Sequence, residues 1–72
     1  MKINLFQLDD GRWFINAIQE SGIMEVIELG VLEKEQAQRE TIRRYPKDEI
    51  KCYDKVVAKA FREGRVKGVL PL

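Results

Sequence analysis

Residues 2–29 read KINLFQLDDGRWFINAIQESGIMEVIEL, and this stretch decides the fold. Two turn signals divide it into three segments rich in β-branched and aromatic residues, which favour strands. Asp10-Gly11 predicts a two-residue hairpin of type I′, because glycine, and with tolerance aspartate, adopts the positive φ that this turn needs. The loop 20–22 predicts a three-residue turn with Gly22 in the left-handed conformation. The stretch is therefore predicted to form a three-stranded antiparallel β-meander.

The two turns also predict which residues pair, and paired residues share a face of the sheet. The first turn would pair Leu8 with Trp13, and the second would pair Ile18 with Met24. One predicted face then contains Phe6, Leu8, Trp13, Ile15, Ala17, Ile27 and Leu29. The other contains Ile3, Leu5, Phe14, Ile18, Met24 and Val26, interrupted by Gln7, Asn16 and Glu28. The first face is predicted to be core, and the second to be either core or an interface.

After Gly30 the apolar period changes from two to three or four residues, which predicts helices. The first is expected over residues 32–45, before Pro46. The second is expected over residues 47–63, where six apolar residues form a stripe on one side. An apolar tail, residues 65–72, would follow as a short strand or a covering segment. The predicted fold class is α+β, a single domain of 72 residues with a meander over residues 1–30 and two helices.

The net charge of +1 conceals an asymmetry between the two halves of the chain. Residues 1–33 hold two basic and six acidic side chains, a balance of −4, whereas residues 34–72 hold eleven basic and six acidic ones, a balance of +5. Such an asymmetry indicates a charged partner. It predicts an acidic sheet and a basic helical half.

The basic half suggests a surface for DNA or RNA. Lysines stand at every fourth position of the predicted second helix, opposite its apolar stripe, where they would form a basic ridge that can follow phosphates. Lysines are also what solvated helix faces ordinarily carry, which is the simpler interpretation. The candidate nucleic-acid-binding residues are Arg39, Arg43, Arg44, Lys47, Lys51, Lys55, Lys59 and Arg62.

Nothing in the sequence predicts an enzyme, a cofactor or a metal site. The chain has no histidine, so the commonest general base and metal ligand is missing. A single cysteine, Cys52, permits no internal disulfide and fits the cytoplasm. Lysines of the predicted ridge would lower its pKa, but no base accompanies it as a nucleophile would require. No apolar run is long enough to span a membrane.

One family resemblance is present in residues 1–45. A strand, then the motif DGRWF of residues 10–14 opening a second strand, a third strand, and a helix with EQA at residues 35–37 resembles the arm-site DNA-binding domain of phage tyrosine integrases. The resemblance implies a sheet that enters the DNA major groove and basic sheet residues that contact DNA. The basic residues of the meander here are Lys2 and Arg12.

Two functions from different classes remain. The first is a non-enzymatic protein-interaction module that docks on a protein or nucleoprotein complex through an acidic, apolar sheet face. Small inhibitors of CRISPR or polymerase complexes that phages or mobile elements encode are comparable in size and in their lack of catalytic residues. The comparison is with this type of protein and not with a sequence. Its candidate partner-binding residues are Leu5, Phe14, Ile18, Met24, Val26, Asp9, Glu25 and Glu28. The second is a DNA- or RNA-binding accessory protein that uses the basic ridge. A homodimer that buries the second face is a further alternative.

Overall fold

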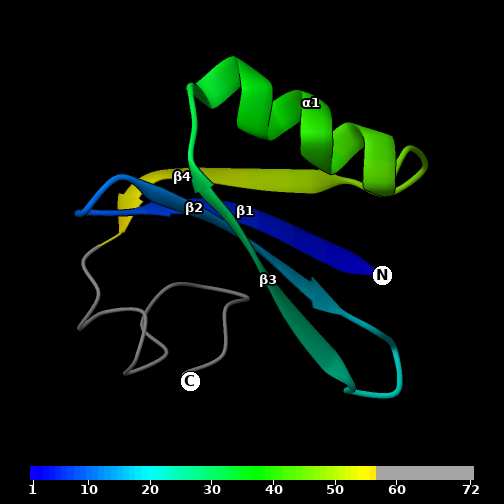
Figure 1. Ribbon diagram of the computed structural model, residues 1–72. Helices are drawn as coiled ribbons and strands as arrows, with labels where there is room; N and C mark the ends of the chain where they lie inside the picture. The colour runs from blue at the N-terminus through cyan, green and yellow to red at the C-terminus, as the bar shows by residue number, and fades with distance from the viewer. Residues whose placement is uncertain (57–72) are drawn as a thin grey trace.

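The computed structural model describes residues 1–56, which form one four-stranded sheet and one helix. The elements are β1 (Lys2–Leu8), β2 (Arg12–Ile18), β3 (Met24–Val31), α1 (Lys34–Arg44) and β4 (Ile50–Val56). Strands β1, β2 and β3 form the predicted antiparallel meander, and β4 pairs in parallel with the free edge of β1. The strand order in the sheet is β3-β2-β1-β4. The α+β class is confirmed, and α1 lies across one face of the sheet (Figure 1).

The β1–β2 hairpin differs by one residue from the predicted register. Gln7, not Leu8, is the partner of Trp13. The loop therefore has three residues and ends at Gly11, which has a φ of 95° and donates its N–H to the Leu8 carbonyl at 3.0 Å. A type I turn followed by a left-handed glycine has this geometry. The Asp10 carboxylate accepts the Arg12 N–H at 3.1 Å and stabilises the turn.

The β2–β3 hairpin has the predicted loop, and the predicted register holds from Ile18 as far as Phe14. Ile18 pairs with Met24, and the turn closes with Gly22 at a φ of 89°. The Gln19 N–H donates to the Ile23 carbonyl at 2.9 Å, which makes this pair the first hydrogen-bonded one of the hairpin. An irregularity between Trp13 and Phe14 shifts the pairing beyond that point.

The first predicted helix is present as α1. Its first turn is closed by a capping box in which the Glu33 N–H donates to the Gln36 side-chain oxygen at 3.2 Å. Arg43 and Arg44 in the last turn complement the helix dipole, and Tyr45 ends the helix. Because only a narrow side of α1 is apolar, the helix packs on the sheet through its small residues, of which Ala37 is fully buried.

The second predicted helix is wrong for the part of it that the structure describes. Residues 50–56 form β4. Ile50 and Cys52, which pairs with Leu5, lie on one face of the sheet, and Lys51 and Tyr53 lie on the other. The physical reason is that β4 supplies hydrogen-bond partners to the outer edge of β1, a non-local pairing that outweighs the helical spacing of apolar residues. Residues 57–63 of that prediction, and the predicted tail 65–72, lie outside the described residues.

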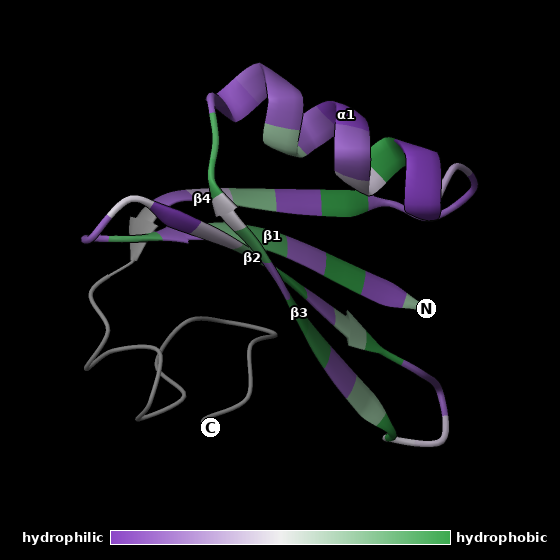
Figure 2. Ribbon diagram, viewed as in Figure 1, coloured by the Kyte–Doolittle hydropathy of each residue, from purple (hydrophilic) through white to green (hydrophobic). Residues whose placement is uncertain are grey.

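The main core lies between α1 and the sheet face that it covers, the helix-covered face. Strand residues alternate along β1, β2 and β3 between this face and the opposite face. Figure 2 shows polar and apolar bands along the strands, and apolar residues contribute to both faces. The buried members of this core are Ile3, Leu5, Trp13, Ile15, Ala17 and Ala37. Partly buried Ile27, Leu29, Leu32, Tyr45 and Ile50 pack against them.

The opposite face holds a second apolar cluster. Phe6, Leu8 and Phe14 are its buried members, and Val26 and Tyr53 pack against them. The one-residue difference in the first hairpin therefore exchanges the predicted contributions of β1: Ile3 and Leu5 belong beneath the helix, and Phe6 and Leu8 belong here. A one-residue register change moves every side chain of a strand to the other face.

Candidate functional site

The strongest candidate for a working surface is the outer edge of β3. This strand has eight residues and lies at the end of the sheet, so that one side of its backbone has no strand partner among residues 1–56. Natural sheets usually protect such an edge with lysine, proline or a short strand, because unpaired backbone groups recruit other chains. β3 contains neither lysine nor proline, its charged side chains are Glu25 and Glu28, and the irregularity in its ladder lies near its end. We call β3 together with Ile23, which precedes it, the acidic edge.

The pairing of β3 with β2 determines which backbone groups point outward. Hydrogen-bonded and non-hydrogen-bonded pairs alternate along an antiparallel ladder. Since the Gln19–Ile23 pair is hydrogen-bonded, Glu25 and Ile27 also direct their N–H and C=O groups toward β2. The residues between and after them point outward. The outward donors and acceptors of the acidic edge are therefore those of Met24, Val26 and Glu28.

Apolar side chains are unusually accessible along the same strand. Ile23 at its start is 63% exposed and Val31 at its end is 74% exposed. Met24 and Val26, on the opposite face, are half-buried. An exposed apolar residue is ordinary by itself, but two at the ends of an open strand add apolar contact area to the unpaired backbone.

The acidic residues of this edge have different surroundings. Glu25 lies on the helix-covered face and is exposed, and it makes no ion pair within the described part of the chain. Burial raises the pKa of the Tyr45 hydroxyl, and the charge of Glu25 raises it further. Glu28 lies on the opposite face, where its carboxylate accepts a hydrogen bond from the Arg12 guanidinium at 3.0 Å.

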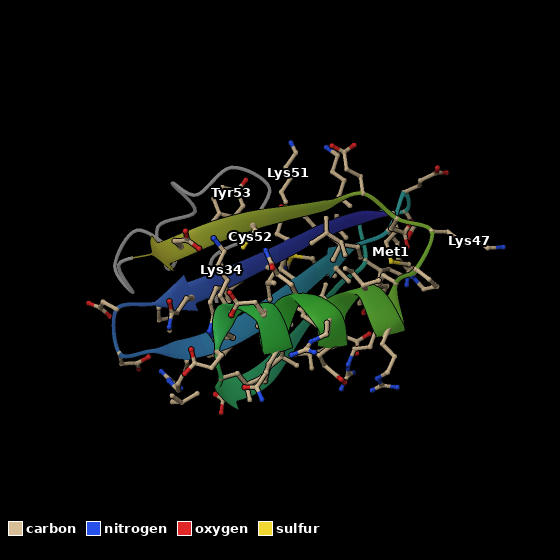
Figure 3. All side chains as sticks on the ribbon, turned by 90° about the horizontal axis from the view of Figure 1, so that it is seen from above. Met1, Lys34, Lys47, Lys51, Cys52 and Tyr53 are labelled. Carbon is tan, nitrogen blue, oxygen red and sulfur yellow. The ribbon has the colours of Figure 1, made fainter. Side chains whose placement is uncertain are left out.

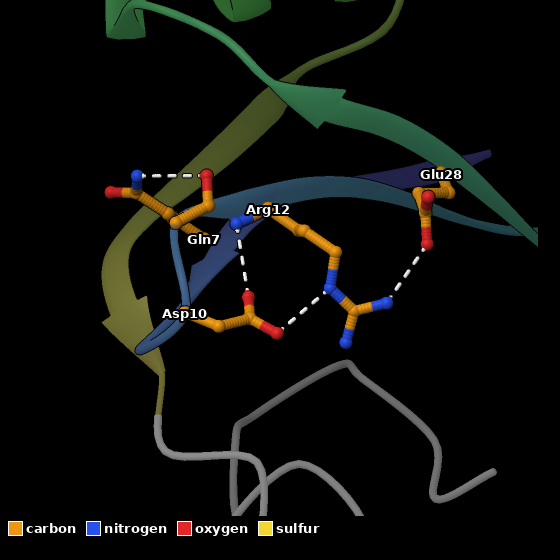
Figure 4. Close-up of polar contacts among 5 residues, drawn as sticks. Gln7, Asp10, Arg12 and Glu28 are labelled. Atoms are coloured by element: carbon orange, nitrogen blue, oxygen red, sulfur yellow. Dashed lines mark hydrogen bonds and ion pairs between the residues drawn. The ribbon is translucent and has the colours of Figure 1, made fainter.

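Arg12 connects this edge to the first hairpin (Figure 4). Its guanidinium donates to Asp10 at 2.8 Å as well as to Glu28, and its Cζ lies 5.3 Å from the centre of the Phe14 ring. The N–H of Arg12 lowers the pKa of Asp10 by hydrogen bonding, and the guanidinium lowers it further. Gln7 donates to the Gly11 carbonyl at 3.1 Å and holds the other side of the loop. Arg12 is therefore committed to contacts within the molecule.

The predicted partner-binding face does not exist as one surface. Leu5 is fully buried beneath α1, whereas Phe14 belongs to the opposite face and is only 7% exposed. Phe14 stacks on Phe6 across the hairpin, with ring centres 5.5 Å apart. Of the remaining predicted residues, Ile18, Met24, Val26 and Glu28 share the opposite face, Glu25 lies on the helix-covered face, and Asp9 lies in the first hairpin loop.

A polar pair interrupts the opposite face near its middle. Asn4 and Asn16 are buried cross-strand neighbours, and the Asn4 amide donates to the Asn16 side-chain oxygen at 3.4 Å. The Asn16 amide in turn contacts the Met24 sulfur at 3.2 Å. Because buried polar groups need partners, this pair fixes the alignment of β1, β2 and β3 at one position.

The predicted basic ridge is also divided by the fold. Lys51 belongs to β4 and extends from its outer side away from α1, and exposed Lys47 lies in the loop before that strand (Figure 3). Arg39, Arg43 and Arg44 belong to α1 instead, and the last two both pair with Glu40. Hydrogen bonds from Arg43, followed by those from Arg44, lower the pKa of Glu40. Lys55 is a residue of β4, and Lys59 and Arg62 lie outside the described residues.

Cys52 has surroundings that differ from the prediction. Its side chain lies beside α1, where Gln38, Ile42, Ile50 and Cys52 itself line a groove of about 300 Å³. Cys52 is exposed, but partial desolvation beside α1 raises the pKa of its thiol, and the Asp54 charge raises it further, although Lys34 acts in the opposite direction. Lys34 donates to Asp54 at 3.0 Å, and this ion pair links the start of α1 to β4. The predicted lowering of the thiol pKa is therefore wrong.

The described residues bring together no group of three potential metal ligands from His, Cys, Asp and Glu. Helix α1, with 11 residues, falls short of the length that a membrane span requires, and no other helix occurs among residues 1–56.

Ile23 and Val31 are not among the predicted partner-binding residues, because those residues were predicted for a sheet face and not for a strand edge. The available signal was the order of the meander itself, since the third strand of a meander has one side that the other two cannot cover. Comparison of the chain with known protein families, characterised proteins and solved structures found no match. The resemblance to integrase arm-site domains stays a prediction.

Proposed function

We propose that this protein is a non-enzymatic protein-interaction module that docks on a larger protein or nucleoprotein complex through its acidic edge. One observation carries the proposal: the eight-residue edge strand β3 is preceded by Ile23 and ends with Val31, and these two side chains are 63% and 74% exposed. Open backbone, exposed apolar side chains and carboxylates coincide there. Strand edges of this kind bind other chains unless they are protected.

The charge of the acidic edge favours a basic partner surface. Glu25 is exposed and unpaired within residues 1–56, and Glu20 lies in the adjoining loop. Complementary charge brings partners together faster and excludes partners of like charge. Surfaces that ordinarily hold nucleic acid are basic, so a host complex of that kind, such as a CRISPR or polymerase complex, suits an inhibitor with this edge.

Nucleic-acid binding is the alternative function, and Arg39 supports it, because it is exposed on α1 and makes no ion pair in the described part of the chain. Arg43 and Arg44, on the same helix, both form ion pairs with Glu40. This alternative predicts binding to DNA or RNA that weakens as salt increases. If the purified protein shows no salt-sensitive binding to DNA or RNA, this alternative is excluded.

The test compares two exposed isoleucines. Tagged wild-type protein, Ile23→Lys and Ile42→Lys are each used to capture proteins from nuclease-treated cells of the source organism, with quantitative mass spectrometry as the measurement. Ile42 is 54% exposed on α1 and is the matched control. We expect a partner that wild type and Ile42→Lys retain and Ile23→Lys loses. The same captured set for all three proteins would contradict the proposal.

A further inference from the structure

We infer that the acidic edge binds its partner by strand addition, pairing with an extended basic segment that becomes a fifth strand beside β3. This inference rests on the proposed function and specifies its mode of binding. Main-chain hydrogen bonds supply affinity in such complexes, and alternate side chains supply specificity. The backbone of β3 already has the extended geometry that the added strand requires.

The outward backbone groups define the contact. Met24, Val26 and Glu28 direct their N–H and C=O groups away from β2. No strand of residues 1–56 forms hydrogen bonds with these outward groups. Three successive outward residues offer donors and acceptors at alternate positions, which is the pattern that a strand partner satisfies. The adjacent hydrogen-bonded pairs with β2 hold β3 in place, so the edge is preorganised.

The side chains specify the chemistry of the segment. Glu25 and Glu28 lie three residues apart and on opposite faces of the sheet. A strand that pairs with β3 and carries basic residues three positions apart therefore places one beside Glu25, which makes no ion pair within residues 1–56, and the other beside Glu28, which already accepts a hydrogen bond from Arg12. Between and beside them it needs apolar residues, which contact Met24 and Val26 on the opposite face and exposed Ile23 on the helix-covered face.

A second copy of the chain is the less favourable occupant. Pairing β3 with another β3 brings two copies of Glu25 and Glu28 into one interface and supplies no basic residue from the strand itself. Like charges close together in a sheet are unfavourable. A basic segment from a different protein removes this repulsion and gains opposite-charge pairs instead.

The test uses a defined probe and the full 72-residue chain. The probe is the peptide acetyl-Thr-Lys-Thr-Val-Lys-Val-Ile-Thr-amide, whose lysines are three positions apart, and the control peptide has glutamate at both lysine positions. Amide hydrogen exchange is measured by NMR with each peptide in excess. We expect the basic peptide to slow exchange at Met24, Val26 and Glu28 by roughly tenfold or more. We expect the control peptide to leave these rates unchanged.

Two variants extend the test to the backbone and the charge. Val26→Pro removes an outward N–H and leaves the β2–β3 hydrogen bonds intact, so it should weaken peptide binding by about tenfold, the loss expected for one hydrogen bond. Glu25→Lys should also weaken it, and Glu49→Lys, the same charge change in the exposed loop before β4, should not. If Val26→Pro does not fold, the exchange measurement on wild type decides alone.

Each outcome has a separate meaning. Absence of protection at the three outward amides overturns strand addition, as does protection by both peptides alike. Protection that appears without peptide and grows with protein concentration assigns the edge to a second copy and also overturns it. If Ile23→Lys loses a captured partner while the outward amides stay unprotected, the proposed function stands and only the binding mode fails. If Ile23→Lys loses nothing, the proposed function itself fails.

Discussion

The indole N–H of Trp13 donates a hydrogen bond to the carbonyl of Leu32 at 2.9 Å. This contact joins the start of β2 to the segment between β3 and α1, 19 residues away in sequence. Trp13 is 1% exposed and belongs to the core beneath the helix. The same side chain therefore fills the core and fixes where the chain leaves the acidic edge to begin α1.

Replacing Trp13 with phenylalanine should destabilise the fold by about 1–3 kcal/mol, because the Leu32 carbonyl loses its donor and the core loses volume. Urea unfolding followed by circular dichroism measures the difference. Tyr45→Phe is the matched control, since the Tyr45 hydroxyl makes no hydrogen bond within the described residues, and it should change stability by less than about 0.5 kcal/mol. Equal losses in the two variants would contradict the role given to the indole N–H.

Gly22→Ala should cost about 1 kcal/mol, and the cost should come from the backbone alone. Gly22 has a φ of 89°, and apart from Gly22 itself and its two chain neighbours no residue has an atom within 4 Å of the position that a Cβ would occupy. Gly22→Asn should cost less than the alanine variant, because asparagine tolerates the left-handed conformation better. Unfolding in urea measures both. An alanine variant as stable as wild type would show that the second loop adopts another turn in solution.

Acid should remove the contribution of Glu40 to stability. Hydrogen bonds from Arg43 lower the pKa of Glu40 from its ordinary value of 4.5, so the folded state binds a proton less readily than the unfolded state. The contribution is therefore present above pH 4.5 and disappears as the pH falls through the lowered folded value. We expect Glu40→Gln to be less stable than wild type at neutral pH and to approach it in acid. A stability difference that stays constant with pH would contradict this prediction.

Cys52 should react slowly with iodoacetamide in the folded protein. Partial desolvation and the Asp54 charge raise the pKa of its thiol, and the thiolate is the reactive species. Alkylation at neutral pH should be roughly several-fold slower than in the urea-unfolded chain. Asp54→Asn should accelerate it and Lys34→Gln should slow it, with equal rates for all three chains in urea. A folded thiol that reacts faster than the unfolded one would contradict the assignment.

The local part of the fold could be predicted from sequence, and the register of the first hairpin could not. Gly22 and Gly11 both mark left-handed positions, and both loops place a glycine at the end of a three-residue turn. Asp10-Gly11 suits a two-residue turn equally well by composition, so the residues of the loop alone do not distinguish the two registers. Core packing does distinguish them, because Leu5, and not Phe6, lies beneath α1 together with Ile15.

β4 was missed for a different reason. Ile50, Tyr53 and Val56 have the spacing of a helical stripe, and local periodicity favours a helix there. The competing interaction is the pairing of Ile50 with Ile3 and of the following residues with β1, which joins positions more than forty residues apart. No local pattern contains that information. Because Lys51 and Lys55 belong to β4, this described part of the predicted basic ridge does not lie on a helix.

The most direct test of the acidic edge is the amide exchange pattern of β3 in the free, monomeric protein. If the edge is open, the amides of Met24, Val26 and Glu28 exchange rapidly, and those of Glu25 and Ile27, which are bonded to β2, exchange slowly. An open edge predicts this alternation of fast and slow exchange along one strand. Slow exchange at all five amides in a monomer would show that the edge is already covered, and would contradict the account.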